Sequence, residues 1–222
     1  MENYKLPLCI AEAEFTEKKS RFIGKLSPVS SEEEALSFLK SVREAHREAS
    51  HNVYAYRLKQ SNICRHSDDG EPSGSAGMPL LDVFQKQDIY DFCCVATRYY
   101  GGINLGVGGL VRAYARCATV TLDASEVGIM QELALCVASM AYPYYEPFRR
   151  LLRASNVKMV SEDFGTEVKL RFSLPSGDLQ ELQNKVTELT AGTVLVDAED
   201  IIMGVHAAVS FLRVDKVTNP RG

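Results

Sequence analysis

The sequence predicts a two-domain α+β protein, and two observations carry this prediction. Eight of the 15 glycines lie between residues 70 and 109, in a region where a β-rich run, a glycine turn and a helical pattern follow one another. After about residue 132 the periodicity changes to the order βαββαβ, which is typical of a ferredoxin-like domain. A chain of 222 residues fits two small domains. We predict a first domain over residues 1–128 and a second over 129–205, and leave the tail of 206–222 unassigned.

The first domain is expected to contain four strands and three helices. Alternating apolar and polar residues predict two strands within residues 8–29, joined by a turn at Glu17-Lys18-Lys19-Ser20. Ser31 and Glu34 form a capping box, which predicts a helix over 32–47. β-rich runs predict strands over 52–58 and 92–99, and apolar faces predict helices over 79–87 and 107–123. Residues 59–78, between the predicted strand over 52–58 and the predicted helix over 79–87, are expected to be irregular.

The second domain is expected to follow the ferredoxin-like order. Its predicted elements are a strand over 133–141, a helix that starts at Pro147, strands over 157–164 and 167–174, a helix from Ser176 to Gly192, and a strand over 193–202.

Composition limits the classes of function. The net charge is −4 and the isoelectric point is about 5.7, so any nucleic-acid binding requires a local basic patch. The first residues lack the apolar core of a signal peptide, and no apolar run is long enough for a membrane span. The six cysteines show no paired spacing, so we interpret them as reduced, mostly buried thiols. These features predict a cytoplasmic protein without a membrane partner.

The glycine turn is the sharpest chemical signal. Gly101-Gly102 and Gly106-Val107-Gly108-Gly109 lie between a predicted strand and a predicted helix, where free backbone N–H groups and the helix dipole favour an anion. The spacing matches neither a P-loop nor a dinucleotide fingerprint. Tight packing of the helix on the strand explains the glycines equally well, and both interpretations stay open.

Basic and aromatic residues flank this turn. Arg98, Tyr99 and Tyr100 precede it, and the combination suits phosphate pairing together with stacking on bases or sugars. The alternative is that Arg98 closes a buried pair with a carboxylate while the tyrosines pack. Four cations lie within residues 18–25, and the alternative there is an exposed turn balanced by nearby glutamates.

The acidic loop before the second helix allows two interpretations. His66, Asp68, Asp69 and Glu71 could bind a divalent cation or perform acid–base chemistry. Asp69-Gly70 and Pro72 are strong turn formers, however, and favour a solvated loop. Zinc-spaced ligands and the common hydrolase motifs are absent from the sequence. We therefore predict no metal, no cofactor and no catalytic residue.

Three segments together resemble the IMPACT/YigZ family across about residues 15–125. They are Lys18-Lys19-Ser20-Arg21-Phe22-Ile23, then Asp68-Asp69-Gly70-Glu71-Pro72 with Gly74 and Ala76-Gly77, and finally Arg98-Tyr99-Tyr100-Gly101-Gly102 with Leu105-Gly106 and Gly108-Gly109-Leu110. The resemblance implies a first domain like domain 2 of ribosomal protein S5, followed by the ferredoxin-like domain of the bacterial members.

The resemblance also implies a translation-linked role. The expected function is non-catalytic regulation through binding of RNA, the ribosome or a translation factor, with the oligomeric state left open. The alternative is an enzyme that acts on a phosphorylated small molecule, or a hydrolase, through the same glycine-rich loop. The candidate binding residues are Lys19, Arg21, His66, Asp68, Asp69, Glu71, Arg98, Tyr99, Tyr100, Gly101, Gly102, Asn104, Gly106, Gly108, Gly109, Arg112 and Arg116.

Overall fold

The computed structural model of the protein describes residues 3–209, with side chains up to residue 205. These residues form two compact units, residues 4–128 and residues 129–207, and both mix helices with strands. The predicted two-domain α+β fold is confirmed. In the described part of the chain, no helix is long and apolar enough to cross a membrane.

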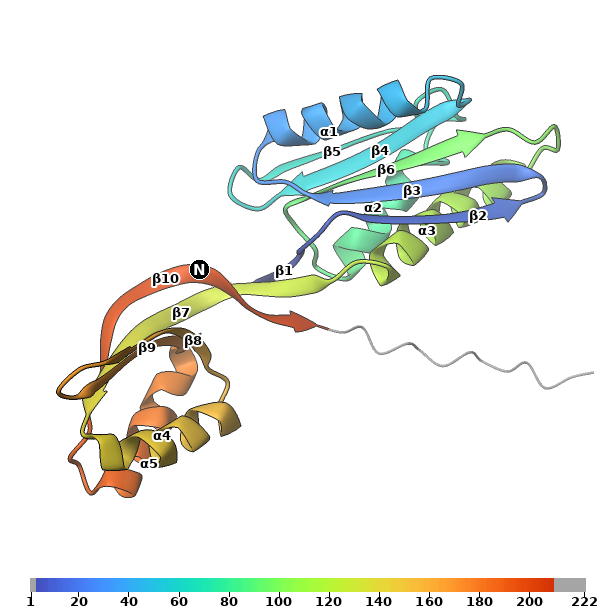
Figure 1. The fold of residues 1–222 in the computed structure, drawn as a ribbon. Helices are drawn as coiled ribbons and strands as arrows, with labels where there is room; N and C mark the ends of the chain where they lie inside the picture. Colours follow the sequence, from blue (N-terminus) through green and yellow to red (C-terminus); the bar gives the residue numbers. More distant parts are fainter. Residues whose placement is uncertain (1–2, 210–222) are drawn as a thin grey trace, which may run out of the picture. The chain divides into compact units, whose positions relative to one another are not determined.

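The N-terminal unit is a five-stranded antiparallel sheet between two layers of helices (Figure 1). Helix α1 packs on one face of the sheet, whereas α2 and α3 pack on the other. The strand order is β2 (Ala11–Glu17), β3 (Ser20–Pro28), β6 (Phe92–Tyr99), β4 (His51–Leu58) and β5 (Ile63–Ser67), and the helices are α1 (Glu32–Ala45), α2 (Gly77–Lys86) and α3 (Val107–Asp123).

Strand β6 lies at the centre of the sheet and is buried on both faces. Cys93 and Val95 join the hydrophobic cluster beneath α1, while Cys94 and Ala96 join the cluster formed with α2 and α3. Because side chains alternate along a strand, one uninterrupted apolar run serves both layers. Burial raises the pKa of the Cys93 thiol to about 12.

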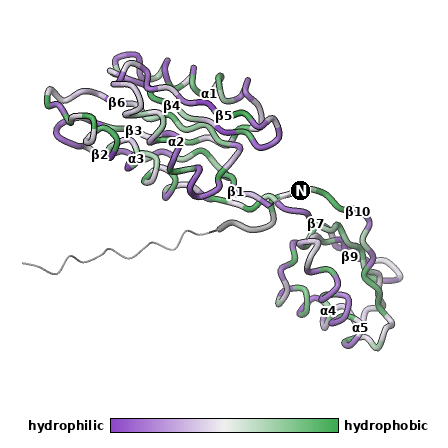
Figure 2. The backbone as a smooth tube through the Cα atoms, turned by 180° about the vertical axis from the view of Figure 1, so that it is seen from behind, coloured by the Kyte–Doolittle hydropathy of each residue, from purple (hydrophilic) through white to green (hydrophobic). Residues whose placement is uncertain are grey.

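Helix α1 begins where its capping box predicts. The Ser31 hydroxyl accepts a hydrogen bond from the backbone N–H of Glu34 at 3.2 Å, and the Glu34 carboxylate accepts one from the N–H of Ser30 at 2.7 Å. Figure 2 shows hydrophobic and hydrophilic residues alternating along the turns of this helix, as expected when one side packs on a sheet.

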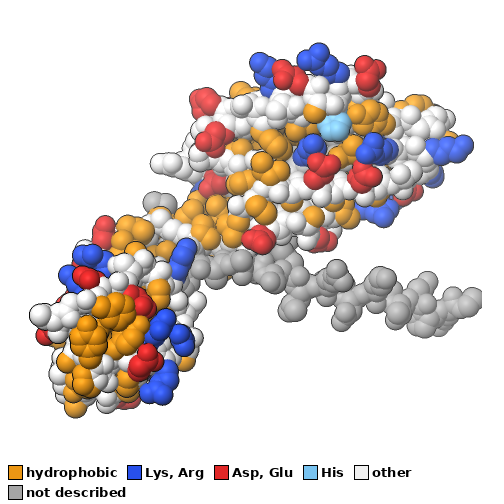
Figure 3. All heavy atoms as spheres, viewed as in Figure 1, with side chains coloured by type: hydrophobic (Ala, Val, Ile, Leu, Met, Phe, Trp, Pro, Cys, Tyr) orange, Lys and Arg blue, Asp and Glu red, His pale blue; other side chains and the backbone are white. Residues whose placement is uncertain are grey.

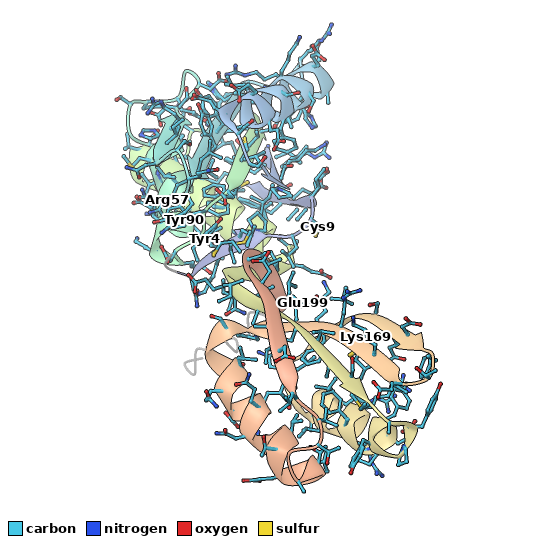
Figure 4. The ribbon with its side chains drawn as sticks, turned by 90° about the vertical axis from the view of Figure 1, so that its left-hand side faces the viewer. Tyr4, Cys9, Arg57, Tyr90, Lys169 and Glu199 are labelled. Carbon is cyan, nitrogen blue, oxygen red and sulfur yellow. The ribbon has the colours of Figure 1, made fainter. Side chains whose placement is uncertain are left out.

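A short first strand, β1 (Tyr4–Pro7), was not predicted from the sequence. Hydrogen bonds connect Leu8 N–H to Glu126 O at 2.8 Å and Tyr90 N–H to Lys5 O at 2.9 Å. Beside them the Arg57 guanidinium lies 3.5 Å from the centre of the Tyr90 ring, with Tyr4 close by (Figure 4). These partners come from distant parts of the chain, so local periodicity could not reveal the strand.

The prediction of an irregular stretch over 59–78 is wrong in part, because residues Ile63–Ser67 form β5. This strand lies at the edge of the sheet and pairs only with β4, through contacts such as Ala55 opposite His66. An edge strand is half-exposed and shows little apolar alternation, so its pairing with β4 decides its conformation.

The C-terminal unit has the ferredoxin-like order and strand pairing. Strands β10, β7, β9 and β8 lie in that order, and Phe148, Phe172 and Leu182 belong to its hydrophobic cluster. The elements are β7 (Val127–Met140), α4 (Tyr142–Ala154), β8 (Lys158–Phe164), β9 (Val168–Pro175), a 3-10 turn η1 (Ser176–Asp178), α5 (Leu179–Thr190) and β10 (Val196–Val209).

Three predicted boundaries in this unit need correction. Helix α4 begins at Tyr142, so Pro143 is the proline of its first turn and Pro147 lies inside the helix. Strand β7 begins earlier than predicted and β10 continues to Val209, beyond the predicted end at residue 202. The remainder of the unassigned tail, residues 210–222, lies outside the described residues.

We expect the six thiols to react in an order set by burial. Cys9 is exposed and Cys64 is half-buried, whereas the other four cysteines are buried. Burial also raises the pKa of the Cys117 thiol to about 12, which suppresses the reactive thiolate. Native protein treated with a maleimide and analysed by mass spectrometry should therefore be labelled first at Cys9 and then at Cys64. Rapid labelling of Cys93 or Cys94 before unfolding would contradict the double-sided burial of β6.

Candidate functional site

The turn between β2 and β3 places two lysines in an unusual backbone conformation. Glu17 pairs with Ser20, so Lys18 and Lys19 alone form the loop of the hairpin, with φ angles of 44° and 65°. Two-residue hairpin turns with positive φ at both positions strongly favour Asn-Gly. An ordinary L-residue in this left-handed region costs about 1–2 kcal/mol.

The lysine turn lies directly against the glycine turn. A Cβ atom on Gly101 would lie 2.0 Å from the Lys19 carbonyl oxygen, so no larger residue fits there. The Gly101 N–H also donates to the Ser20 hydroxyl at 3.3 Å. The sequence alone did not show whether the hairpin folds beside the glycine turn, and the structure shows that it does.

The N-terminus of α3 has no capping side chain. Gly106 precedes the helix with a φ of 71°, a conformation that favours glycine, and no acidic residue lies in the first helical turn. The first N–H groups of an α-helix have no partner within the helix. A Cβ added to Gly108 would meet only Arg112 Nη1 at 3.6 Å, so glycine is not required there for packing.

Exposed cations gather around this helix terminus. Arg116 approaches Glu17, the residue before the lysine turn, at 3.5 Å, and Arg112 lies one helical turn closer to the N-terminus of α3. In the described part of the chain, Lys18, Lys19 and Arg112 form no ion pair, and all three are exposed. Figure 3 shows Lys and Arg side chains at this end of the unit. We name the surface formed by Lys18, Lys19, Gly101, Gly108 and Arg112 the basic end face.

A hollow of about 490 Å³ opens beside the same helix terminus. Polar side chains form part of its wall, and apolar side chains form the remainder. The lining residues are His51, Glu71, Pro72, Arg98, Tyr100, Asn104, Leu105, Gly106, Val107 and Leu110.

A buried ion pair forms the floor of the hollow. Arg98 Nη1 lies 2.6 Å from Glu71 Oε1, and the two side chains are 5% and 4% exposed. The Tyr114 hydroxyl donates to the same oxygen at 2.7 Å, and burial beside this carboxylate raises the pKa of Tyr114. Arg98 therefore closes a buried carboxylate pair, the alternative that the sequence left open. Its charge is neutralised inside the protein, which corrects the expectation of Arg98 as an exposed phosphate contact.

His51 is a residue of the hollow that the sequence did not reveal. Its Nδ1–H donates to the Asp69 carbonyl at 2.8 Å, and its Nε2 lies 3.8 Å from Glu71 Oε1. Strand pairing places His51 opposite Arg98. The position of His51 beside Arg98 and Glu71 depends on the register of β4 against β6, so no local sequence motif could have predicted that His51 lines the hollow.

The acidic loop residues mainly organise the loop. Asp68 accepts hydrogen bonds from three backbone N–H groups at 2.8–3.0 Å, and Asp69 binds Arg43 and the N–H of Asn52. His66 is exposed on the edge strand β5. Among the described residues, no three His, Cys, Asp or Glu side chains come together as metal ligands.

Tyr99 and Arg21 lie apart from the hollow. The Tyr99 hydroxyl contacts His46 Nδ1 at 2.9 Å, and Arg21 pairs with Glu14. Because neighbouring side chains in a strand point to opposite faces, Tyr99 and Arg98 cannot line one patch. The candidate residues that do meet at the hollow are Glu71, Arg98, Tyr100, Asn104 and Gly106. At the basic end face, Lys19 lies against Gly101, and Arg112 lies beside Gly108.

Comparison with known proteins decides the family. The Impact N-terminal domain family matches residues 18–122, and a domain of unknown function, DUF1949, matches residues 139–193. The chain is 35% identical to the IMPACT family member YvyE of Bacillus subtilis, over 82% of this chain and 84% of that protein. The chain belongs to the IMPACT family.

Two further comparisons support this IMPACT family assignment along the chain. The chain is 32% identical to the IMPACT family member YigZ of Escherichia coli, over 87% of this chain and 97% of that protein. A crystal structure described only as that of a hypothetical protein is 31% identical, covers 90% of this chain and 98% of its own, and has a TM-score of 0.57. The similarity to both proteins therefore includes both domains.

In this IMPACT family member, we expect Glu71→Gln to destabilise the fold strongly, because Arg98 then remains as a buried charge without its carboxylate. Removal of one partner from a buried pair costs about 3–5 kcal/mol. The double variant Glu71→Gln/Arg98→Met should lose less stability than the two single variants added together. Urea denaturation measures the free energies of unfolding, with Glu44→Gln on exposed α1 as the control. A loss near that of the control would contradict the structural role of the pair.

We also expect the contribution of Asp68 to stability to depend on pH. Burial alone would raise the pKa of this carboxyl, but hydrogen bonds from Gly74, Gly77 and Ala76 outweigh it and lower the pKa. A folded-state pKa below the unfolded value stabilises the fold above the unfolded pKa, and this stabilisation is lost as the pH falls through the folded pKa. Asp68→Asn should therefore be less stable than wild type at neutral pH, and the difference should shrink in acid. A difference independent of pH would show that the charge of Asp68 is not involved.

Proposed function

We propose that the protein binds RNA in a translation-linked role, by contacts between the basic end face and RNA phosphates. The observation that carries the proposal is the pair of unpaired lysines held at positive φ in the β2–β3 turn. The net charge of the chain is −4, so affinity for a polyanion has to come from such a local patch.

The turn carries a conformational cost, and among the described residues neither lysine side chain has an ion-pair partner. Asn-Gly would suit the backbone of Lys18 and Lys19 better, yet the chain has two cations at these positions. Departures from the locally preferred residue are typical of functional sites. Neighbouring exposed backbone at Gly108 and the Arg112 guanidinium suit phosphate oxygens, which accept hydrogen bonds from both kinds of donor.

The translation-linked setting follows from the IMPACT resemblance, in which the eukaryotic member regulates translation. RNA binding of this kind requires no catalytic residue, because a polyanion is bound by charge and backbone donors alone. The reduced thiols fit a cytoplasmic site of action.

The turn itself provides a test. We expect Lys18→Asn/Lys19→Gly to weaken binding of single-stranded RNA while the melting temperature stays equal or rises. Each lost contact with a single-stranded phosphate should lower the slope of log affinity against log salt by about 0.7. Two contacts would therefore lower it by about 1.4. Fluorescence anisotropy of a labelled mixed-sequence RNA at several salt concentrations measures this slope.

Arg112→Ala is the second variant, and Lys40→Ala is its matched control. Arg112→Ala should lower the salt slope by about 0.7 if it removes one phosphate contact, with little effect on stability, because an exposed arginine contributes about 0–1 kcal/mol. Lys40 is an exposed cation on α1, outside the basic end face, and its removal should leave the slope unchanged. Equal losses in both variants, or no salt-dependent binding by wild type, would refute the proposal.

A further inference from the structure

We propose that the hollow beside α3 is a binding site for a phosphomonoester whose carbon skeleton carries hydroxyl groups. Two kinds of ligand carry such a group: a free sugar phosphate and the phosphorylated end of an RNA chain. Lys18, Lys19 and Arg112 do not line the hollow, so this site uses none of the cations on which the RNA-binding proposal rests.

The N-terminus of α3 supplies the anion-binding end. Gly106 and Val107 line the hollow. The N–H groups of Val107, Gly108 and Gly109 lie in the first turn of α3, where backbone N–H groups have no hydrogen-bond acceptor within the helix. A phosphate offers three terminal oxygens to such a set of donors, and the helix dipole favours its charge. Because no acidic side chain lies in this first turn, nothing there repels the anion.

The buried carboxylate supplies an independent second contact. Both hydrogen bonds that reach the Glu71 side chain from the described residues end on Oε1, so neither serves Oε2. The Arg98 Nε of the same pair is also buried without a partner. Glu71 lines the hollow, so a ligand hydroxyl can donate a hydrogen bond to its free carboxylate oxygen, Oε2. A second anion cannot bind at this carboxylate, so the two ends of the hollow select different groups.

The walls between these ends suit a small carbon skeleton. Leu105, Val107 and Leu110 form an apolar side, while the Tyr100 hydroxyl donates to Asn104 at 3.0 Å on the rim. The volume of about 490 Å³ lies within the range of about 300–1,000 Å³ common for small-molecule sites. A sugar presents both C–H and O–H groups, which matches a wall of mixed character.

Val107 allows an experiment that separates binding from folding. Val107 is 59% exposed at the first position of α3, so the fold does not depend on its side chain. Aspartate at this position suits the helix dipole but repels a phosphate, whereas asparagine has the same shape without the charge. The comparison of Val107→Asp with Val107→Asn therefore changes only the electrostatics of the proposed site.

The probes are ribose 5-phosphate, ribose and inorganic phosphate, measured by isothermal titration calorimetry with melting curves beside them. We expect wild type to bind ribose 5-phosphate at least about tenfold more tightly than either fragment. Val107→Asp should lose about tenfold or more relative to Val107→Asn, with an equal or higher melting temperature. Equal binding by the two variants, or no preference of wild type for the phosphorylated sugar, would overturn the proposal.

A second comparison identifies the source of the ligand. RNA with a 5′-phosphate should bind more tightly than the same RNA with a 5′-hydroxyl if the hollow receives an RNA end, and Val107→Asp should abolish that preference. Binding of ribose 5-phosphate without such a preference assigns the site to a free sugar phosphate. Lys18→Asn/Lys19→Gly should leave ribose 5-phosphate binding unchanged, so that failure of the RNA proposal and failure of this one are distinguishable.

Discussion

The buried pair of Glu71 and Arg98 connects the parts of the N-terminal unit from which both candidate surfaces are built. Arg98 belongs to β6 and Glu71 to the loop before α2, and the side chain of Tyr114 reaches the pair from α3. Arg98 Nη2 also lies 3.2 Å from the Ser20 hydroxyl at the start of β3. Two charges removed from water are stable only when they are paired, so these elements depend on one another for their positions.

This arrangement decides where positive charge remains available. Because Arg98 is neutralised by Glu71, the floor of the hollow carries little net charge, and attraction for an anion has to come from the backbone N–H groups of α3. Outside the hollow, Lys18, Lys19 and Arg112 have no acidic partner among the described residues. The structure thus separates a polar, mostly neutral hollow from a cationic outer surface, although both adjoin the same helix terminus.

The glycines of this region serve different physical purposes. Gly101 is required because the backbone of Lys19 leaves no room for a Cβ atom, whereas Gly106 has open space around it and is favoured by its positive φ. Gly108 has neither constraint, which leaves its N–H accessible at the start of α3. Close packing therefore explains Gly101 and backbone conformation explains Gly106, although both belong to one glycine-rich string.

The sequence by itself determined the elements whose signals are local. The capping box at Ser31 and Glu34, the apolar run of β6 and the periodicity of α3 each depend on neighbouring residues, so helix and strand could be predicted from them. The tertiary structure alone decided which charges are neutralised and which residues meet. The partner of Arg98, the entry of His51 into the hollow and the existence of the edge strand β5 all depend on strand register and on long-range pairing. Such contacts join residues far apart in the chain, and no short pattern encodes their geometry.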